Sequence, residues 1–382
     1  MRYCKSCLTT DLRPNADFDD DGVCIACRFS DSRTNFNADY RVLKKIIDGY
    51  LKDSDRYYDC IVGVSGGKDS TRQALWVRDK LKLNPLLVCC GYPPLQMSKL
   101  GADNLESLVK LDFDLVYACP APDTAKELSK ESFFKFGNIL KATEIALFST
   151  VPRLAIDMDI PLIFWGENPA LQVGDSAAMG KDKFDGNQLR QLNTIASNGN
   201  AWMDPLFTSQ ANKYLYNYPN EQEFEDKSVQ ILYLGPAWDN WSVDNNSVFS
   251  VLNGLHVRPE QDNIGTSDVI GTSTLDEEFA HINMMLKYYK FGFGRATDLA
   301  NELIRNKKIT RDDAIDFVAK SDGVCSDRII DSYCEYIGIT LDEFWAEVNK
   351  ITNPDIFEVC HGERPRPKFQ IGVGLDERSC NY

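Results

Sequence analysis

The sequence lacks long apolar runs and has few histidines and comparatively few basic residues. Because a membrane-spanning helix needs about 18 or more consecutive apolar residues, we expect no transmembrane segment. The residues from Met1 to Cys7 have no apolar core of the kind found in signal peptides, so the expected location is the cytoplasm. Lys and Arg number 42 against 57 Asp and Glu, which gives a formal net charge of −15. Such a field would repel nucleic acid, and the balance favours a small-molecule substrate.

What is present is typical of a folded protein of several parts. The 382 residues are enough for two or three domains with a sizeable core. Hydrophobic residues make up 43% and charged residues 26%, which is usual for soluble globular proteins. Short apolar segments alternate with helical patterns between residues 59 and 166. This alternation predicts an α/β fold built on a doubly wound parallel sheet.

A turn with two adjacent glycines joins the first predicted strand to a helix. Residues 59–64 are apolar and β-branched, as in a buried parallel strand, and residues 70–81 have apolar positions at helical spacing. Between them, the glycines let backbone N–H groups close on a ligand, and the helix N-terminus favours an anion. Lys68 adds a mobile cation, Asp69 is a candidate for holding magnesium or capping the helix, and Ser70 is expected to begin the helix as a hydroxyl cap. The simpler alternative is an ordinary tight turn.

Polar residues also follow the other predicted strands, at the sheet edge where ligands of such folds bind. One crevice is expected to be surrounded by Ser65–Ser70, Cys90–Tyr92, Cys119 and Gly166–Pro169. Glu167 could bind magnesium or substrate there, and Asn168 could bind a hydroxyl group. Equally, Asn168 and Pro169 could form only a turn, with Glu167 a solvated charge.

The cysteines form one metal-binding pattern and several isolated positions. Two Cys-x-x-Cys pairs lie among turn-forming residues: Cys4, Cys7, Cys24 and Cys27. Four thiolates at this spacing suit tetrahedral zinc, and so short a segment needs a metal to become ordered. We therefore predict a structural zinc knuckle, with free cysteines or an iron–sulfur site as alternatives. Adjacent cysteines on a strand point to opposite faces, so Cys89 and Cys90 are expected to be buried and structural. No ligand spacing connects Cys325, Cys334, Cys360 and Cys380.

A second signature with two glycines runs from Lys290 to Asp298. Gly292 and Gly294 stand between aromatic residues and before Arg295, which predicts backbone donors beside a fixed cation. Arg295 could pair with a phosphate or a carboxylate. The alternative is a joint between two helices, with Arg295 in a surface ion pair.

The segment Val64–Ser70 is not a Walker P-loop, but it resembles the Ser-Gly-Gly-x-Asp-Ser signature of the PP-loop ATP pyrophosphatases. Together with the four-cysteine knuckle, Phe164–Asn168 and Lys290–Asp298, it makes nearly the whole chain resemble the bacterial N-acetyl sugar amidotransferases. This resemblance implies conversion of an acetamido group into an acetamidino group in the biosynthesis of O-antigen or nonulosonic acids. ATP would be cleaved between its α and β phosphates, with Mg²⁺ at the phosphates and Zn²⁺ in the knuckle.

The same resemblance implies roles for individual residues. Lys68, Asp69 and Arg295 are expected to be catalytic. ATP and pyrophosphate would be bound by Val64, Ser65, Gly66, Gly67, Lys68, Asp69, Ser70 and Gly91. The acetamido sugar, which is expected to be nucleotide-linked, would be bound by Glu167, Asn168, Arg295 and Asp298.

We expect four parts along the chain. They are a zinc-binding knuckle (1–34), a PP-loop ATP-binding domain (35–175), an irregular substrate-cap region (176–275) and a helical C-terminal region (276–382). The third part scatters tryptophans and tyrosines through polar sequence, which fits a cap over a sugar or nucleotide. These aromatic residues could equally be the core of an irregular subdomain.

No glutaminase signature is present, so we expect a separate glutaminase subunit to supply ammonia. Loss of Met1 would expose Arg2 rather than a nucleophilic cysteine, and only three histidines are available to orient a thiol. Two rival functions stay open. A tRNA-modifying PP-loop enzyme, either a thiolase or a lysidine-type ligase, would need a basic surface. A non-catalytic nucleotide sensor would keep the ATP site for regulation.

Overall fold

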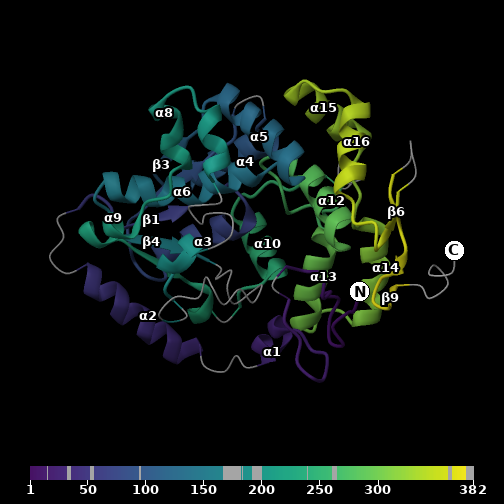
Figure 1. Cartoon of the computed structure of the whole chain (residues 1–382). Helices are drawn as coiled ribbons and strands as arrows, with labels where there is room; N and C mark the ends of the chain where they lie inside the picture. The colour runs from purple at the N-terminus through teal and green to yellow at the C-terminus, as the bar shows by residue number, and fades with distance from the viewer. Residues whose placement is uncertain are drawn as a thin grey trace.

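In the computed structural model, a sheet with helices on both faces lies beside a group of C-terminal helices (Figure 1). The N-terminal segment lies against those C-terminal helices, far from it in sequence. One of the bonds between them runs from Arg311 Nε to the carbonyl oxygen of Cys7, at 3.1 Å. The structure describes residues 1–14, 16–31, 36–51, 56–93, 96–166, 182, 184–191, 200–238, 240–259, 265–359 and 364–375.

The central sheet has five strands in the order β3-β2-β1-β4-β5, and every neighbouring pair is parallel. The strands are β1 (Cys60–Gly63), β2 (Pro85–Cys90), β3 (Leu115–Ala118), β4 (Leu162–Trp165) and β5 (Gln230–Tyr233). All six residues of β2 are buried. A strand covered on both faces reads as a continuous apolar run, which is the pattern seen in the sequence. The predicted doubly wound parallel sheet is therefore confirmed.

Helices cover the two faces of this sheet with separate apolar clusters. They include α2 (Phe36–Tyr50), α3 (Lys68–Asp79), α4 (Lys99–Lys110), α5 (Pro122–Phe136) and α6 (Lys141–Asp157). On one face, Ile47 of α2 and Leu75 of α3 pack with strand residues such as Val62. On the other face, Val151 and Ala155 of α6 pack with the alternate strand residues. This alternation also separates Cys89 from Cys90, which are both buried but lie in different clusters, as predicted.

The described residues between 184 and 259 are built onto the same sheet. Their elements are η2 (Asn187–Gln191), η4 (Ala201–Leu206), α8 (Gln210–Lys213), η5 (Tyr214–Tyr216), α9 (Glu221–Asp226), β5, η6 (Gly235–Ala237) and α10 (Val243–Leu252). The boundary expected at residue 175 thus falls before the last strand of the sheet. Trp238 is buried and stacks on Trp76 of α3 at 4.6 Å between ring centroids, so this tryptophan is part of the core.

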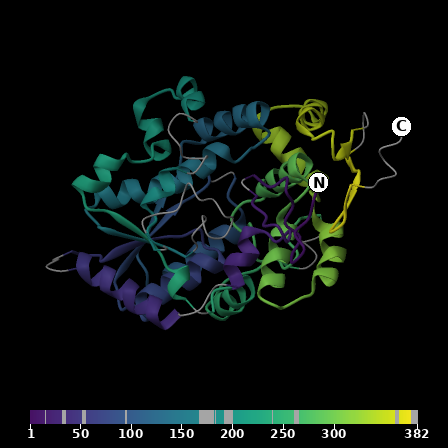
Figure 2. The same ribbon diagram turned by 60° about the horizontal axis from the view of Figure 1, so that its bottom comes forward.

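Within the described residues after 265, five further helices form the C-terminal body. They are α12 (Ala280–Phe291), α13 (Arg295–Arg305), α14 (Arg311–Ser321), α15 (Asp327–Ile337) and α16 (Leu341–Ile351). Their apolar residues share one cluster, to which Leu8 of the N-terminal segment also belongs. Two short antiparallel pairs follow, β6 (Phe357–Glu358) with β7 (Arg366–Pro367) and β8 (Phe369–Gln370) with β9 (Gly374–Leu375). Figure 2 shows these helices and the N-terminal segment together on one side of the sheet.

Capping explains where α4 begins but not where the helix after β1 begins. The helix α4 begins at Lys99, because the Ser98 hydroxyl accepts the N–H of Gly101 and caps it. The helix after β1 begins at Lys68 rather than at Ser70. Among the described residues, no helix combines the length and apolar character needed to cross a bilayer.

Candidate active site

The turn after β1 enters α3 without a side-chain cap. Gly66 has a φ of +77°, and a Cβ there would lie 3.2 Å from the backbone nitrogen of Leu105, so only glycine fits. Gly67 is the N-cap in extended conformation, and no side chain caps the helix from this position. Within the described part of the chain, the backbone N–H groups of Gly67, Lys68 and Asp69 have no acceptor. Uncapped donors at a helix N-terminus attract an anion such as a phosphate.

Ser70 stabilises this turn from inside. Its Oγ donates to the carbonyl oxygen of Gly67 at 3.2 Å and accepts the N–H of Ser65 at 3.4 Å. The prediction that Ser70 begins α3 is wrong, because the extended Gly67 already ends the turn and the helix starts at once. Val64 continues the strand edge, since its N–H donates to Val88 O at 2.9 Å. Ligand binding by Val64, Ser65 and Ser70 stays a prediction.

A helix from the other half of the chain holds the charged pair that follows the turn. Lys68 Nζ lies 2.6 Å from Asp69 Oδ2, and Asn246 of α10 donates to Asp69 Oδ1 at 2.6 Å. Asn246 in turn accepts from Arg72 Nη1 at 2.5 Å. The hydroxyl of Ser250, also on α10, donates to the carbonyl oxygen of Lys68 at 2.6 Å. Both the first turn of α3 and the carboxylate of Asp69 are therefore fixed from α10.

The charged and polar groups around Asp69 favour the ionised form of its carboxylate. Burial disfavours the carboxylate form, but Lys68, the bond from Asn246 and the nearby Arg295 outweigh it and lower the pKa of Asp69. An ionised carboxylate is a suitable ligand for Mg²⁺. Lys68 can exchange Asp69 for an oxygen of an anionic ligand, because its side chain is long and its charge is a point charge.

The second glycine signature forms a joint between two helices. Gly292, with a φ of +73°, ends α12, and Gly294 precedes α13. The carboxylate of Asp322 accepts the N–H groups of Gly294 and Ala296, both at 2.8 Å, and the hydroxyl of Thr297. The backbone donors expected to face a ligand are therefore already used, and that expectation is corrected. For the backbone, the alternative of a helix–helix joint holds.

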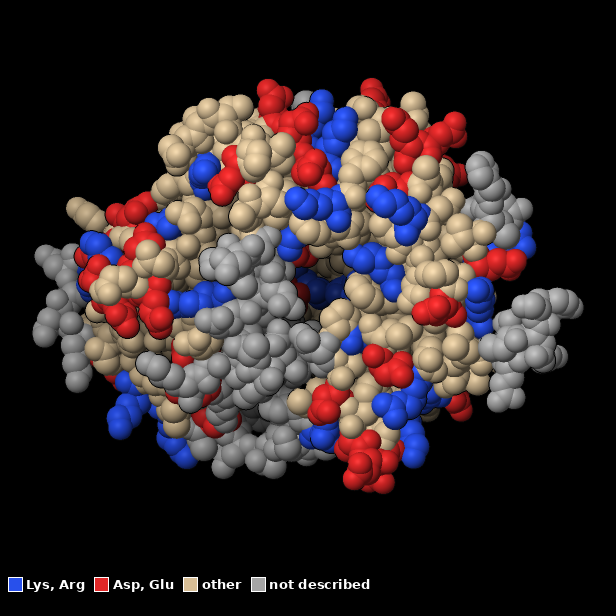
Figure 3. Space-filling view, viewed as in Figure 1, with Lys and Arg blue, Asp and Glu red and all other residues tan. Residues whose placement is uncertain are grey.

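Arg295 is not in a surface ion pair, contrary to that alternative. Its Nη2 donates to Ser273 Oγ at 2.7 Å, and among the described residues it makes no salt bridge. It borders a cavity of about 330 Å³ that Lys68 and Asp69 also line. The space-filling view shows an opening near the centre of its face, with Lys and Arg side chains around it (Figure 3). A protein with a net charge of −15 thus has local positive charge on this face.

Asp298, expected to bind substrate, borders the same cavity but already has two cationic partners. It contacts Arg13 of the N-terminal segment, and Lys287 Nζ lies 2.7 Å away. Both cations also lie over the ring of Phe293, at 4.3 and 4.5 Å from its centroid. Burial disfavours ionisation of Asp298, but Lys287 and Arg13 outweigh it and hold its pKa well below the ordinary range. Its contact with substrate stays a prediction.

Gly91, another predicted site residue, does not line this cavity. Gly91 follows β2, and a Cβ there would overlap the ring of Tyr117, whose hydroxyl donates to Tyr92 O at 2.7 Å. Packing therefore explains this glycine without a ligand. Glu167 and Asn168 lie outside the described residues.

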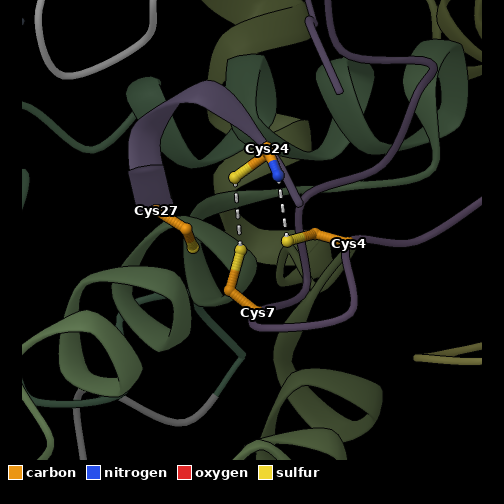
Figure 4. Close-up of side chains that lie close together, drawn as sticks. All are labelled: Cys4, Cys7, Cys24 and Cys27. Carbon is orange, nitrogen blue, oxygen red and sulfur yellow. Dashed lines mark hydrogen bonds between the residues drawn. The ribbon is translucent and has the colours of Figure 1, made fainter. Parts of the chain in front are cut away.

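The four cysteines of the N-terminal segment lie together and are buried (Figure 4). Cys27 belongs to the short helix α1 (Ile25–Asp31), and Cys24 directly precedes it. The four Sγ atoms lie within 4.8 Å of one another, and those of Cys7 and Cys24 are 3.7 Å apart. Zn–S bonds of about 2.3 Å at tetrahedral angles require nearly this separation. The N–H of Cys24 points to Cys4 Sγ at 3.3 Å. This cluster could hold a zinc ion.

Several residues at the site were missed by sequence reasoning. They are Arg13, Arg72, Asn246, Ser250 and Ser273. The available signal for α10 was the spacing of Asn246 and Ser250, four residues apart and so on one face of a helix. Nothing local indicated which helix that face meets.

Fold and site together define an α/β protein with a parallel sheet, an uncapped helix N-terminus suited to phosphate and a separate cysteine cluster. Residues 274–364 match the family model "LPS biosynthesis protein WbpG-like, C-terminal domain". This segment contains Arg295 and the second glycine signature, and the match supports the family resemblance seen in the sequence.

Among solved structures, the chain is similar to an NH3-dependent NAD synthetase from Campylobacter jejuni in complex with the nitrate ion. The identity is 12% and the TM-score 0.28, with 59% of this chain and 99% of that chain covered. The comparison with curated proteins finds no match.

Proposed function

We propose that the chain is an ATP-dependent amidotransferase of bacterial surface-polysaccharide biosynthesis. It converts the acetamido group of an N-acetylated sugar into an acetamidino group, with ammonia from a separate glutaminase subunit. This proposal rests on one observation: the uncapped N-terminus of α3 presents Lys68 and Asp69 to a cavity that Arg295 also borders. The match of residues 274–364 to an LPS biosynthesis family supports the polysaccharide context.

The chemistry follows from the weakness of an amide as an electrophile. The amide oxygen attacks the α-phosphorus of ATP, the bond from that phosphorus to the bridging oxygen breaks, and pyrophosphate leaves. The nitrogen of ammonia then attacks the imidate carbon, the bond from that carbon to the AMP oxygen breaks, and a proton is lost to solvent. The products are the amidine, AMP and pyrophosphate.

The chain's own residues stabilise the charge that moves in the first step. The N–H groups of Gly67 and Lys68 and the ammonium of Lys68 would hold the departing pyrophosphate. Asp69 would hold Mg²⁺, which when bound supplies positive charge to the phosphates. Arg295 would hold an anionic part of the substrate or of the phosphates. Asn246 keeps the Asp69 carboxylate oriented while Lys68 changes partner.

Product analysis tests this proposal. The purified chain is incubated with ATP, ammonium chloride and candidate acetamido sugars, and mass spectrometry seeks the replacement of one oxygen by NH. We expect sugar-dependent release of AMP and pyrophosphate. Release of ADP would contradict the mechanism, and use of glutamine by the chain alone as fast as ammonium would contradict the separate glutaminase. Binding of bulk tRNA at moderate salt would favour the tRNA-modifying alternative.

A further inference from the structure

We propose that the cavity between the cysteine knuckle and α13 is the acceptor pocket, and that Arg305 recognises an anionic group on the N-acetylated sugar. The inference rests on the proposed function and deepens it, because it gives the substrate class and a specificity residue. It also gives the knuckle a second role, as one wall of this pocket.

The cavity is distinct from the predicted nucleotide cradle. Its lining includes Lys68 and Asp69 but none of the turn residues Ser65, Gly66 or Gly67. A nucleotide whose phosphates lie on the backbone of that turn would therefore meet the cavity only at the two charged side chains. A second ligand in the cavity would reach the nucleotide at the same two side chains, which is the geometry that transfer to an acceptor requires.

The acidic residues of the cavity are already engaged by protein groups. Asp69 and Asp298 have the partners described above. Asp17 lies 2.5 Å from a guanidinium nitrogen of Arg28, and Glu302 accepts the N–H of Val243 at 2.7 Å. Asp69, Asp298 and Asp17 thus each have a cationic partner that offsets their charge.

The two arginines of α13 that line the cavity differ in how their charge is compensated. Arg295 donates to the hydroxyl of Ser273 and lies close enough to Asp69 and Asp298 to lower the pKa of both. The side chain of Arg305 has no hydrogen bond or ion pair with any residue that the structure describes, and it is partly buried, so its charge is weakly screened. An anionic ligand would supply the missing charge at Arg305.

The separation of these arginines indicates the size of the ligand. They are the first and last residues of α13, and ten steps of about 1.5 Å place their backbones about 15 Å apart. This exceeds the width of one sugar ring. If the acetamido group reacts beside Lys68 and Arg295, an anionic substituent elsewhere on the acceptor reaches Arg305. Two sources share this chemistry, a phosphate-linked nucleotide and a sugar carboxylate.

The knuckle lines the opposite side of the pocket mostly with uncharged residues. Besides Arg13 and Asp17, its lining residues are Thr9, Ala16, Cys24, Ile25, Ala26 and Ser30. The knuckle is fixed to the pocket's other wall through Asn301 of α13, whose Oδ1 accepts the N–H of Leu8 at 2.7 Å and whose Nδ2 donates to Thr9 Oγ1 at 3.2 Å. Because α13 carries both arginines, the position of the knuckle sets the width of the pocket.

Equilibrium binding of defined probes tests the inference. The probes are UDP-N-acetylglucosamine, N-acetylneuraminic acid and uncharged N-acetylglucosamine, each titrated calorimetrically into the full chain, with ATP titrated separately. We expect one anionic probe to bind, and Arg305→Ala to weaken that binding at least tenfold without changing ATP binding. Arg305→Lys should restore part of the affinity. The matched control is Lys308→Ala, an exposed residue that lies outside the cavity and pairs with Asp244.

A second variant tests the knuckle wall by shape rather than charge. Ala16→Trp should weaken the same probe at least tenfold and leave ATP binding unchanged. The inference is overturned if neither anionic probe binds at millimolar concentration, if Arg305→Ala binds as tightly as the wild type, or if the uncharged sugar binds as well as the anionic ones. Amidine formation is measured in parallel. If binding depends on Arg305 but no amidine forms, the proposed function is contradicted and the pocket is not. If amidine forms at the same rate in Arg305→Ala, the pocket is contradicted and the proposed function is not.

Discussion

The helices α3 and α13 begin with similar residues, but the backbone N–H groups at their N-termini differ in whether another part of the chain accepts them. Both α3 and α13 follow a glycine that provides no side-chain cap, and both have a basic residue in the first position. At α13, the carboxylate of Asp322 occupies the first N–H groups. At α3, no carboxylate from elsewhere does so among the described residues. A glycine signature therefore makes an anion site only where the rest of the chain leaves the helix end open.

A third helix supports this distinction. At the start of α12, the carboxylate of Glu277 accepts the N–H groups of Phe279 and Ala280, at 2.6 and 2.7 Å. Glu277 and Asp322 are both buried. Buried carboxylates thus accept the first N–H groups of both α12 and α13. At α3, by contrast, the carboxylate of Asp69 is turned to Lys68 and Asn246. Asp69 therefore leaves the donors of α3 to a ligand.

Lys68→Ala should have the largest effect on activity, because Lys68 lies at the N-terminus of α3, where the backbone N–H groups are open. Loss of the ammonium removes one charge from the departing pyrophosphate, and we expect amidine formation to fall by about 10³-fold. The rate of AMP release with saturating ATP and acceptor measures it. Circular dichroism should show an unchanged fold, and Lys68→Arg serves as the control that keeps the charge. Activity above a tenth of wild type in the alanine variant would contradict this role.

Asp322→Ala should instead affect stability, because Asp322 accepts the N–H groups at the N-terminus of α13. It leaves buried N–H groups of α13 without an acceptor, and we expect the free energy of unfolding to fall by about 2–4 kcal/mol. Urea unfolding measures this change. Asp322→Asn keeps one acceptor oxygen and should lose less. ATP affinity should not change in either variant, and a large loss of ATP affinity in the folded alanine protein would show that α13 also serves the nucleotide.

Asn246→Ala tests whether α10 keeps Asp69 turned away from the open helix end. Without the amide, the carboxylate can rotate onto the open N–H groups of α3, and we expect a 10- to 100-fold loss of rate at limiting Mg²⁺, with part of it recovered at high Mg²⁺. The neighbouring Asn245→Ala is the matched control, because that residue is exposed and its side-chain amide donates to Asn240 O rather than to Asp69. An equal loss at all Mg²⁺ concentrations would mean that Asn246 is merely structural.

The comparison also explains how far the sequence could predict this site. Strand, turn and helix follow one another within residues 59–81, so local patterns were enough to find the open end of α3 and its charged pair. The closing carboxylate of α13 comes from Asp322, and the support of Asp69 comes from Asn246, 177 positions away. A single Asp or Asn in a polar segment has no local signature, and only the packing of whole helices brings it to its partner. The same reason left Arg13 unassigned, although the cysteine pairs around it predicted the metal site.

The smallest expected effect concerns the closed end of α12 and appears as a pH dependence. Burial raises the pKa of Glu277 to about 8 from its ordinary 4.5, and burial likewise raises the pKa of the adjacent Asp276 to about 6. Between pH 6 and 8, folded Glu277 therefore holds a proton that the unfolded chain has released. The unfolded state binds fewer protons, so the free energy of unfolding should fall as pH rises, by at most about 1.4 kcal/mol per pH unit, and level off above pH 8. Glu277→Gln, which keeps the neutral form, should flatten this slope in urea unfolding series between pH 6 and 8, while Asp69, whose pKa is lowered, contributes nothing in that range. An unchanged slope in the glutamine variant would show that Glu277 is ionised in the folded protein and caps α12 as a charged carboxylate.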